Sequence, residues 1–207
     1  MFDNLILRYA SAAVTLLLAF PVVAAELTQG ERDRALSELH ATRKEFLDAV
    51  SGLSEAQWNF KPAPNRWSVA ECAEHLTLAE EMLFNVVTQK IMHTPAEPRR
   101  ASEVRGKDEL VLSRIPDRTH KAEAPSSVRP AHRWPTPGAT VQEFKTRRDR
   151  TLAYVRTTND DLRDHFLSHP AVGLLDGYQW ILLIAAHTQR HVEQIHEVKQ
   201  DPSYPKK

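Results

Sequence analysis

Two histidines four residues apart, His187 and His191, are the side chains of this sequence best suited to hold a metal ion. They fall in the apolar stripe of a helix expected to begin after Asp176, where the inward positions should be hydrophobic. Burying an unpaired imidazole costs on the order of one to several kcal/mol, so two adjacent rings in a core need a partner. At this spacing both rings lie on one helix face, about a turn apart, as do the two zinc ligands of HExxH motifs.

A third ligand must come from another helix, and His75 is the strongest candidate. On the helix expected after Ser68, it lies within about 60° of Cys72 and Ala79, which are both on the inward face. Three neutral imidazoles suit zinc, nickel, iron or manganese and leave coordination positions for water or substrate. The alternative is that the HxxxH pair lies on the surface, or is buried and satisfied by hydrogen bonds. Cys72 is either a fourth ligand or a small core residue, and its place in the apolar stripe favours the core.

No side chain stands out as a general base. Glu71 is committed to a capping box, and Glu74 and Glu80 are expected to point partly away from the histidines. Glu71, Glu193 and Gln194 are instead candidates for orienting the imidazoles through hydrogen bonds. Three tryptophans near the expected helix ends either line a pocket or fill the core, and their size favours the core: Trp58, Trp67 and Trp180.

The composition limits the ligands and partners of this chain of 207 residues. A single cysteine excludes an internal disulfide and a cysteine-rich metal site. Lys plus Arg and Asp plus Glu are both 27, so no overall field favours nucleic acid or anionic lipid. The length suits one domain. We therefore expect a small-molecule substrate and no nucleic-acid partner. Small bundles often dimerise through an outer helix face, and no sequence patch decides between monomer and homodimer.

Four helices are expected, because four capping boxes occur along the chain, each followed by helical periodicity. In a capping box, the N-cap residue and the residue three positions later bond each other's backbone amides. The four pairs are Thr28 with Glu31, Ser68 with Glu71, Thr140 with Glu143, and Asp176 with Gln179. No segment alternates with period two for long enough to form an adequate strand. The fold class is therefore all-α.

A long segment, residues 94–139, separates the second and third expected helices. It is rich in proline and charge and has room for one short helix near 103–115. A bundle needs a connection of this length when two neighbouring helices run parallel. We therefore expect a four-helix bundle with a long crossover between helices 2 and 3. The third helix carries a basic run that is expected to be a solvated face rather than an anion site: Lys145, Arg147, Arg148 and Arg150.

The first 25 residues have the pattern of a secretory signal peptide. Residues 9–25 carry no charge, and small residues precede Glu26. The apolar run is short of the roughly 20 residues that a membrane-spanning helix needs, and Pro21 interrupts it. We expect residues 1–25 to be a cleaved signal peptide and residues 26–207 to be the bundle domain. The mature protein would be periplasmic or secreted, without stable membrane insertion. An uncleaved N-terminal anchor is the alternative.

The motifs around the histidines resemble those of DinB-like proteins. The runs WNFKP at 58–62, NRWSVAE at 65–71 and EHL at 74–76 resemble the start of that superfamily's second helix. The C-terminal runs DGYQW at 176–180 and HTQRH at 187–191 resemble its last helix. The resemblance covers nearly the whole mature chain. It implies a four-helix bundle with a long link between helices 2 and 3. It also implies a divalent metal ion held by three histidines, which correspond here to His75, His187 and His191.

The reaction that we expect is hydrolysis of a small molecule by metal-activated water, whose pKa such a site lowers toward about 7. The resemblance also allows a thiol-dependent S-transferase, because other DinB-like proteins use a low-molecular-weight thiol. Such thiols are kept reduced in the cytosol, so an exported protein is less suited to depend on one. Two non-catalytic alternatives stay open. One is a bundle that binds a metal ion or small molecule, and the other is a purely structural bundle.

Overall fold

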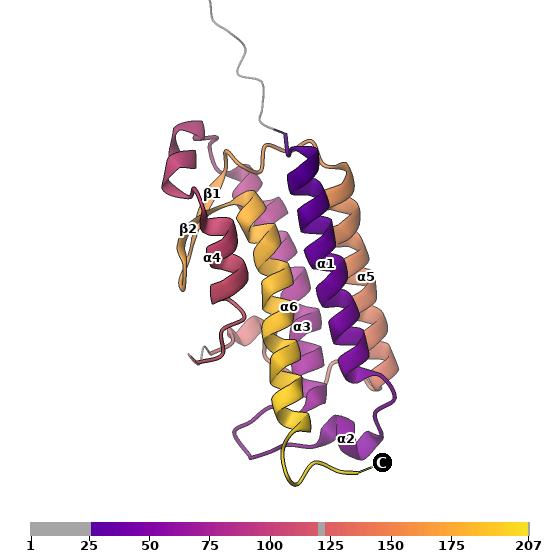
Figure 1. Ribbon diagram of the computed structural model, residues 1–207. Helices are drawn as coiled ribbons and strands as arrows, with labels where there is room; N and C mark the ends of the chain where they lie inside the picture. The colour runs from indigo at the N-terminus through magenta and orange to yellow at the C-terminus, as the bar shows by residue number, and fades with distance from the viewer. Residues whose placement is uncertain (1–25, 120–122, 207) are drawn as a thin grey trace, which may run out of the picture.

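The computed structural model describes residues 26–119 and 123–206. The predicted signal peptide lies outside the described residues. Four long helices form the bundle in this part of the chain, and they are α1 (Gln29–Val50), α3 (Val69–Asn85), α5 (Pro137–Thr157) and α6 (Gly177–Lys199). Helices α1 and α6 run in one direction, and α3 and α5 run in the opposite direction (Figure 1). Contacts join α1 to α6, α6 to α3, α3 to α5 and α5 to α1, so the expected four-helix bundle is confirmed.

The crossover leads from the end of α3 back to the opposite end of the bundle, where α5 begins (Figure 1). Helix α3 continues into a π turn (Val86–Lys90) and a 3-10 turn (Ile91–His93). The crossover then contains 3-10 turns at Pro98–Glu103 and Ser126–Val128, with helix α4 (Lys107–Arg114) between them. Helix α4 packs against α6. The long connection between two parallel neighbours is therefore confirmed, and its described residues include a short α-helix, α4, in the expected region.

Three of the four expected capping boxes begin helices in the structure, at Thr28, Ser68 and Asp176. The fourth expectation is wrong, because the N-cap of α5 is Thr136, whose hydroxyl accepts from the Ala139 N–H at 3.1 Å. Pro137 occupies the first helical position, where its fixed φ and missing N–H favour a helix start. Thr140 is instead a buried residue within the first turns of the helix.

A short β-hairpin that the sequence pattern did not reveal precedes α6. Strands β1 (Phe166–His169) and β2 (Gly173–Asp176) pair antiparallel, with Phe166 opposite Asp176. Four residues per strand are too few to show a clear period of two. The chain then enters α6 through Gly177, where an added Cβ would lie 2.9 Å from the Leu162 carbonyl oxygen. The close approach of these two backbones requires glycine at this position.

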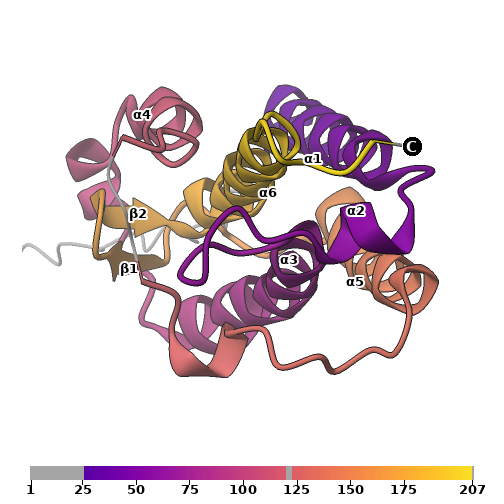
Figure 2. The same ribbon diagram turned by 90° about the horizontal axis from the view of Figure 1, so that it is seen from below.

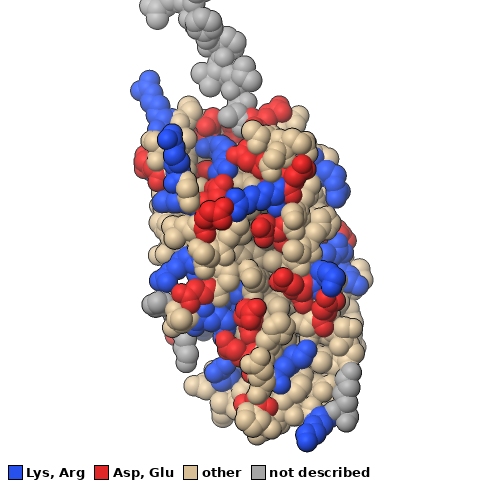
Figure 3. All heavy atoms as spheres, viewed as in Figure 1, with Lys and Arg blue, Asp and Glu red and all other residues tan. Residues whose placement is uncertain are grey.

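The opposite end of the bundle is closed by α2 (Glu55–Asn59) and the C-terminal tail (Figure 2). The Gln57 amide donates to the Pro205 carbonyl at 3.0 Å and joins the two segments. Acidic and basic side chains are interspersed over the face shown in Figure 3. None of the described helices combines the length and the apolar character needed to cross a membrane.

The basic run of α5 is not uniformly solvated as expected. Arg148 is fully buried and forms an ion pair with Glu80 of α3 at 2.8 Å. Lys145 and Arg147 are partly exposed, and Arg150 is exposed beside Glu81 at 2.8 Å. The expectation is therefore wrong for Arg148, because a buried carboxylate on a neighbouring helix compensates its charge.

Candidate metal centre

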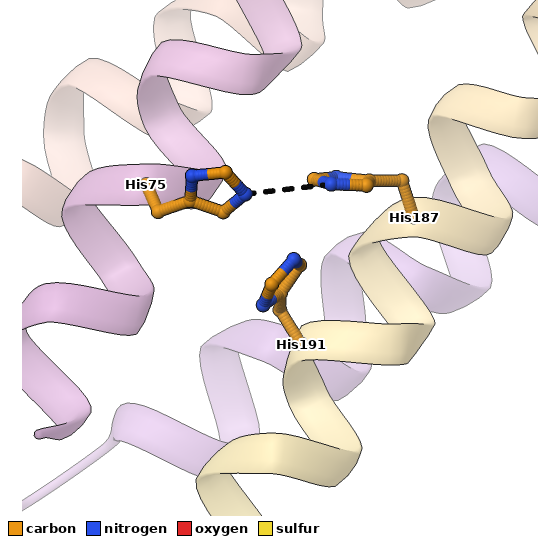
Figure 4. A group of neighbouring side chains, drawn as sticks. All are labelled: His75, His187 and His191. Carbon is orange, nitrogen blue, oxygen red and sulfur yellow. Dashed lines mark hydrogen bonds between the residues drawn. The ribbon is translucent and has the colours of Figure 1, made fainter. Parts of the chain in front are cut away.

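The structure brings His75, His187 and His191 together inside the bundle (Figure 4). Helix α3 carries the first residue, and one face of α6 carries the other two. Each ring offers a nitrogen within 4.8 Å of the others, and His75 Nε2 lies 3.4 Å from His187 Nε2. His75 and His191 are buried, whereas His187 is partly exposed. The three predicted residues thus converge on one point inside the bundle.

The donor set fits a divalent transition metal. Zinc binds imidazole nitrogens at about 2.0–2.1 Å, which places two nitrogens of a tetrahedral site about 3.4 Å apart. The His75 and His187 nitrogens already have this separation. Among the described residues, no cysteine, aspartate or glutamate joins the three histidines. Cys72 lies in the apolar core as expected, where burial raises the pKa of its thiol. The three-histidine cluster therefore suggests a divalent metal ion and leaves its identity open.

Hydrogen bonds at Nδ1 set the tautomers of two of the rings. The Nδ1–H of His75 donates to the Val128 carbonyl oxygen at 2.8 Å. The Nδ1–H of His191 donates to the Gln194 Oε1 atom, also at 2.8 Å. Each ring therefore keeps its lone pair on Nε2, the atom available to a metal ion.

Of the three residues expected to orient the rings, Gln194 does so. Glu71 instead completes the capping box of α3 and pairs with Lys61 at 2.8 Å. Glu193 lies 3.8 Å from the His196 ring. Sequence reasoning missed Val128, because a backbone carbonyl can belong to any residue type and leaves no trace in the sequence.

The surroundings favour neutral imidazoles. Burial lowers the pKa of His75, and it lowers the pKa of His187 and of His191 well below the ordinary value. The neighbouring imidazoles also lower the pKa of both α6 rings. The positive charge of Arg190 lowers the pKa of His187, and that of Arg118 lowers the pKa of His191. Because neutral imidazole is the form that binds metals, protons compete weakly for these nitrogens near neutral pH.

Trp67 is the one tryptophan of the three considered that lies at the site. Its ring centroid is 4.9 Å from that of His75 and 6.1 Å from that of His191, with the second pair stacked. Trp58 and Trp180 are buried core residues. The indole of Trp67 therefore forms an apolar wall beside two of the imidazoles.

The two acidic side chains near His75 on α3 are engaged elsewhere. Glu74 accepts hydrogen bonds from three consecutive backbone N–H groups of residues 131–133. Glu80 accepts hydrogen bonds from Arg148 and from the Thr151 hydroxyl. Both carboxylates therefore support the fold. This agrees with the expectation that they point partly away from the histidines. The arrangement can hold a cation through three neutral nitrogens, with no carboxylate of α3 poised as a base.

Comparison with known proteins gives a family and a fold. A sequence model of the DinB superfamily matches residues 38–195. The chain is 26% identical over 165 residues to the uncharacterized protein YuaE of Bacillus subtilis (strain 168), covering 80% of this chain and 97% of YuaE. The fold is similar to that of YfiT from Bacillus subtilis, with a TM-score of 0.53 and 16% identity over 86% of this chain and 91% of YfiT. YfiT is described as a probable metal-dependent hydrolase with an unusual four-helix bundle topology.

Proposed function

This chain belongs to the DinB superfamily, and we propose that it is an exported metal-dependent hydrolase of a small molecule. The observation that carries the proposal is the convergence of three imidazole nitrogens within 4.8 Å of one another. The description of YfiT as a probable metal-dependent hydrolase supports the same class of reaction. The proposed ligands are His75, His187 and His191, and the proposed ion is zinc, nickel, iron or manganese.

The residues of the chain provide the binding and the orientation that this chemistry needs. When bound, a divalent ion supplies Lewis acidity, which lowers the pKa of water and polarises a carbonyl or phosphoryl oxygen. The Val128 carbonyl and Gln194 keep the Nε2 lone pairs of His75 and His191 available. Trp67 offers an apolar surface beside the rings, suited to the hydrocarbon part of a small substrate.

The pattern of residues 1–25 supports export to the periplasm or the exterior. Mass spectrometry of the protein recovered from the producing cell tests this part of the proposal. We expect an N-terminus at Glu26. Recovery of the uncut chain with the membrane fraction would instead favour an N-terminal anchor.

A non-catalytic metal-binding role is the second candidate. It is favoured by one observation, which is that Glu74 and Glu80 are both occupied by hydrogen bonds to neighbouring groups. In this role the site would hold an ion without catalysing a reaction. Metal content alone does not separate the two candidates, so the decisive measurement is turnover.

The test begins with elemental analysis of the protein purified without added metal. We expect about one ion per chain in the wild type and in His196→Ala, whose ring is exposed on the same helix, and no ion in His187→Ala. Because a bound ion stabilises the folded state, chelator should lower the Tm of the wild type. In thermal melts, this lowered Tm should equal the Tm of His187→Ala. Full occupancy in His187→Ala would refute the ligand assignment.

The hydrolase proposal is then tested with chromogenic carboxylic ester, amide and phosphoester substrates. We expect one class to be hydrolysed by the metal-loaded wild type, and the activity to disappear with chelator and in His187→Ala. A fully loaded protein that hydrolyses none of the three classes would favour the binding role.

A further inference from the structure

The crossover between α3 and α5 contacts the histidine cluster in two places, directly at His75 and through Gln194 at His191. Val128, in the 3-10 turn Ser126–Val128, accepts the hydrogen bond of His75 Nδ1 at 2.8 Å. Arg118, which follows α4, donates to Gln194 Oε1 at 3.4 Å. The same oxygen accepts the hydrogen bond of His191 Nδ1 at 2.8 Å. One segment of the chain therefore contacts the groups that set the tautomers of two proposed ligands.

Glu74 holds the crossover a few residues beyond the first of these contacts. Its buried carboxylate accepts from the backbone N–H groups of Ala131, His132 and Arg133 at 2.9, 2.9 and 3.1 Å. His132 has a φ of 55°, and such left-handed backbone can direct consecutive N–H groups toward one anion. Because Glu74 precedes His75 directly, the carboxylate and the imidazole hold the same stretch of crossover against the same turn of α3.

Arg118 fixes the second contact. Its guanidinium is anchored by the Glu197 carboxylate at 2.6 and 2.9 Å, with Nη1 directed to Gln194. Arginine only donates hydrogen bonds, so the oxygen of the Gln194 amide, rather than its nitrogen, faces Arg118 and His191. That orientation requires the proton of His191 to lie on Nδ1.

We propose that the crossover completes the metal centre, and that Glu74 and Arg118 are its positioning residues. Glu74 acts on His75 through Val128, and Arg118 acts on His191 through Gln194. The inference rests on the proposed metal site for its effect on affinity. Its effect on the tautomers of the two rings is present without any ion.

The test compares Glu74→Gln and Arg118→Gln with matched controls in the full chain. Arg66→Gln is the control for Arg118, because Arg66 pairs with the same Glu197 carboxylate at 3.0 Å, while the Gln194 oxygen bonds Arg118. Thr28→Ala is the control for Glu74, since losing the α1 cap lowers the stability of the protein at a place away from the crossover. Arg118 is partly exposed, so its variant carries the test if Glu74→Gln does not fold.

Two readouts are measured on each protein. Nitrogen NMR of the metal-free protein, at a pH where the rings are neutral, reports the tautomers. We expect pure Nδ1–H forms in the wild type and the controls, a mixture at His75 in Glu74→Gln, and a mixture at His191 in Arg118→Gln. Competition of zinc with a chromophoric chelator reports affinity. We expect each variant to bind zinc about tenfold more weakly than its control.

The outcomes separate the two proposals. Variants whose tautomers and zinc affinity equal those of their controls would overturn the positioning roles. A wild type with fixed tautomers that binds no zinc would overturn the metal site. In that case the tautomer readout alone decides whether Glu74 and Arg118 orient the rings.

Discussion

The guanidinium of Arg148 donates two hydrogen bonds to the carboxylate of Glu80, at 2.9 and 2.8 Å, in the interior of the bundle. Its other donors bond the Leu39 carbonyl and the hydroxyls of Thr42 and Thr188. These partners lie on α1 and α6, while Glu80 lies on α3, so one side chain of α5 bonds the other three bundle helices. The buried guanidinium thus has every N–H donor paired, and its partners link α5 to each of the other three helices.

Replacing Glu80 with glutamine should leave this guanidinium buried without its counter-charge. We expect a loss of about 3–5 kcal/mol in the free energy of unfolding, measured by urea denaturation. Glu81→Gln is the matched control on the next residue, where the ion pair with Arg150 is solvated and contributes at most about 1 kcal/mol. Similar losses in the two variants would mean that the buried pair has no special structural role.

The approach of Gly177 to Leu162 gives a second test of how α6 is positioned. In Gly177→Ala the new methyl group would lie 2.9 Å from the Leu162 carbonyl oxygen, so the backbone must shift, and we expect a loss of about 1–3 kcal/mol. Gly30→Ala, in the first turn of α1, meets no atom within 4 Å and should be neutral or stabilising by up to about 1 kcal/mol. Thermal melts of both variants measure the difference. An equal Tm for the two would show that the contact at Gly177 relaxes freely.

Asp176 should make the free energy of unfolding fall as the pH rises, which is the reverse of the usual effect of a carboxyl group. Burial raises the pKa of its carboxyl to about 6, against the opposing charge of Arg163 at 2.8 Å. The same guanidinium also faces Glu31 and Asp108, so three carboxylates share one cation. Between about pH 4 and pH 6 the folded state therefore holds this proton more tightly than the unfolded state. The contribution of Asp176 to stability is present below that range and is lost as the pH rises through it.

The variant Asp176→Asn keeps an N-cap side chain and removes the titration. Relative to the wild type, its free energy of unfolding should rise between pH 4 and pH 7, by up to about 3 kcal/mol, since one pKa unit corresponds to about 1.4 kcal/mol. Urea denaturation at several pH values measures this, and carboxyl NMR of the wild type should show a midpoint near pH 6. Parallel stability curves for the two proteins would contradict the shifted pKa.

The features that could be predicted from the sequence are those that depend on residues close together along the chain. The capping pairs of Thr28, Ser68 and Asp176 are local, so three helix starts could be predicted. The i, i+4 spacing of His187 and His191 is also local, and the helical wheel led from there to His75. The sequence pattern places the start of α5 at Thr140, because the Thr140 and Glu143 pair imitates a capping box, whereas the helix begins at Pro137.

Features that depend on distant partners could not be predicted in this way. Arg148 belongs to a run of surface-like charges, and its burial follows from Glu80, 68 residues away. The hydrogen bond from His75 to Val128 spans 53 residues and ends on a backbone carbonyl. Both are decided by how the bundle and its crossover pack.

Trp67 should report directly on metal binding, because its indole lies 4.9 Å from the ring of His75 and 6.1 Å from that of His191. Nickel bound by those rings would quench the indole fluorescence, and we expect the quenching to saturate at one equivalent. Trp67→Phe should lose most of this change while still binding nickel. Trp134→Phe is the control, since that ring packs against the Arg147 guanidinium at 5.4 Å, and it should keep the change. Quenching that persists in Trp67→Phe would place the ion away from the three histidines.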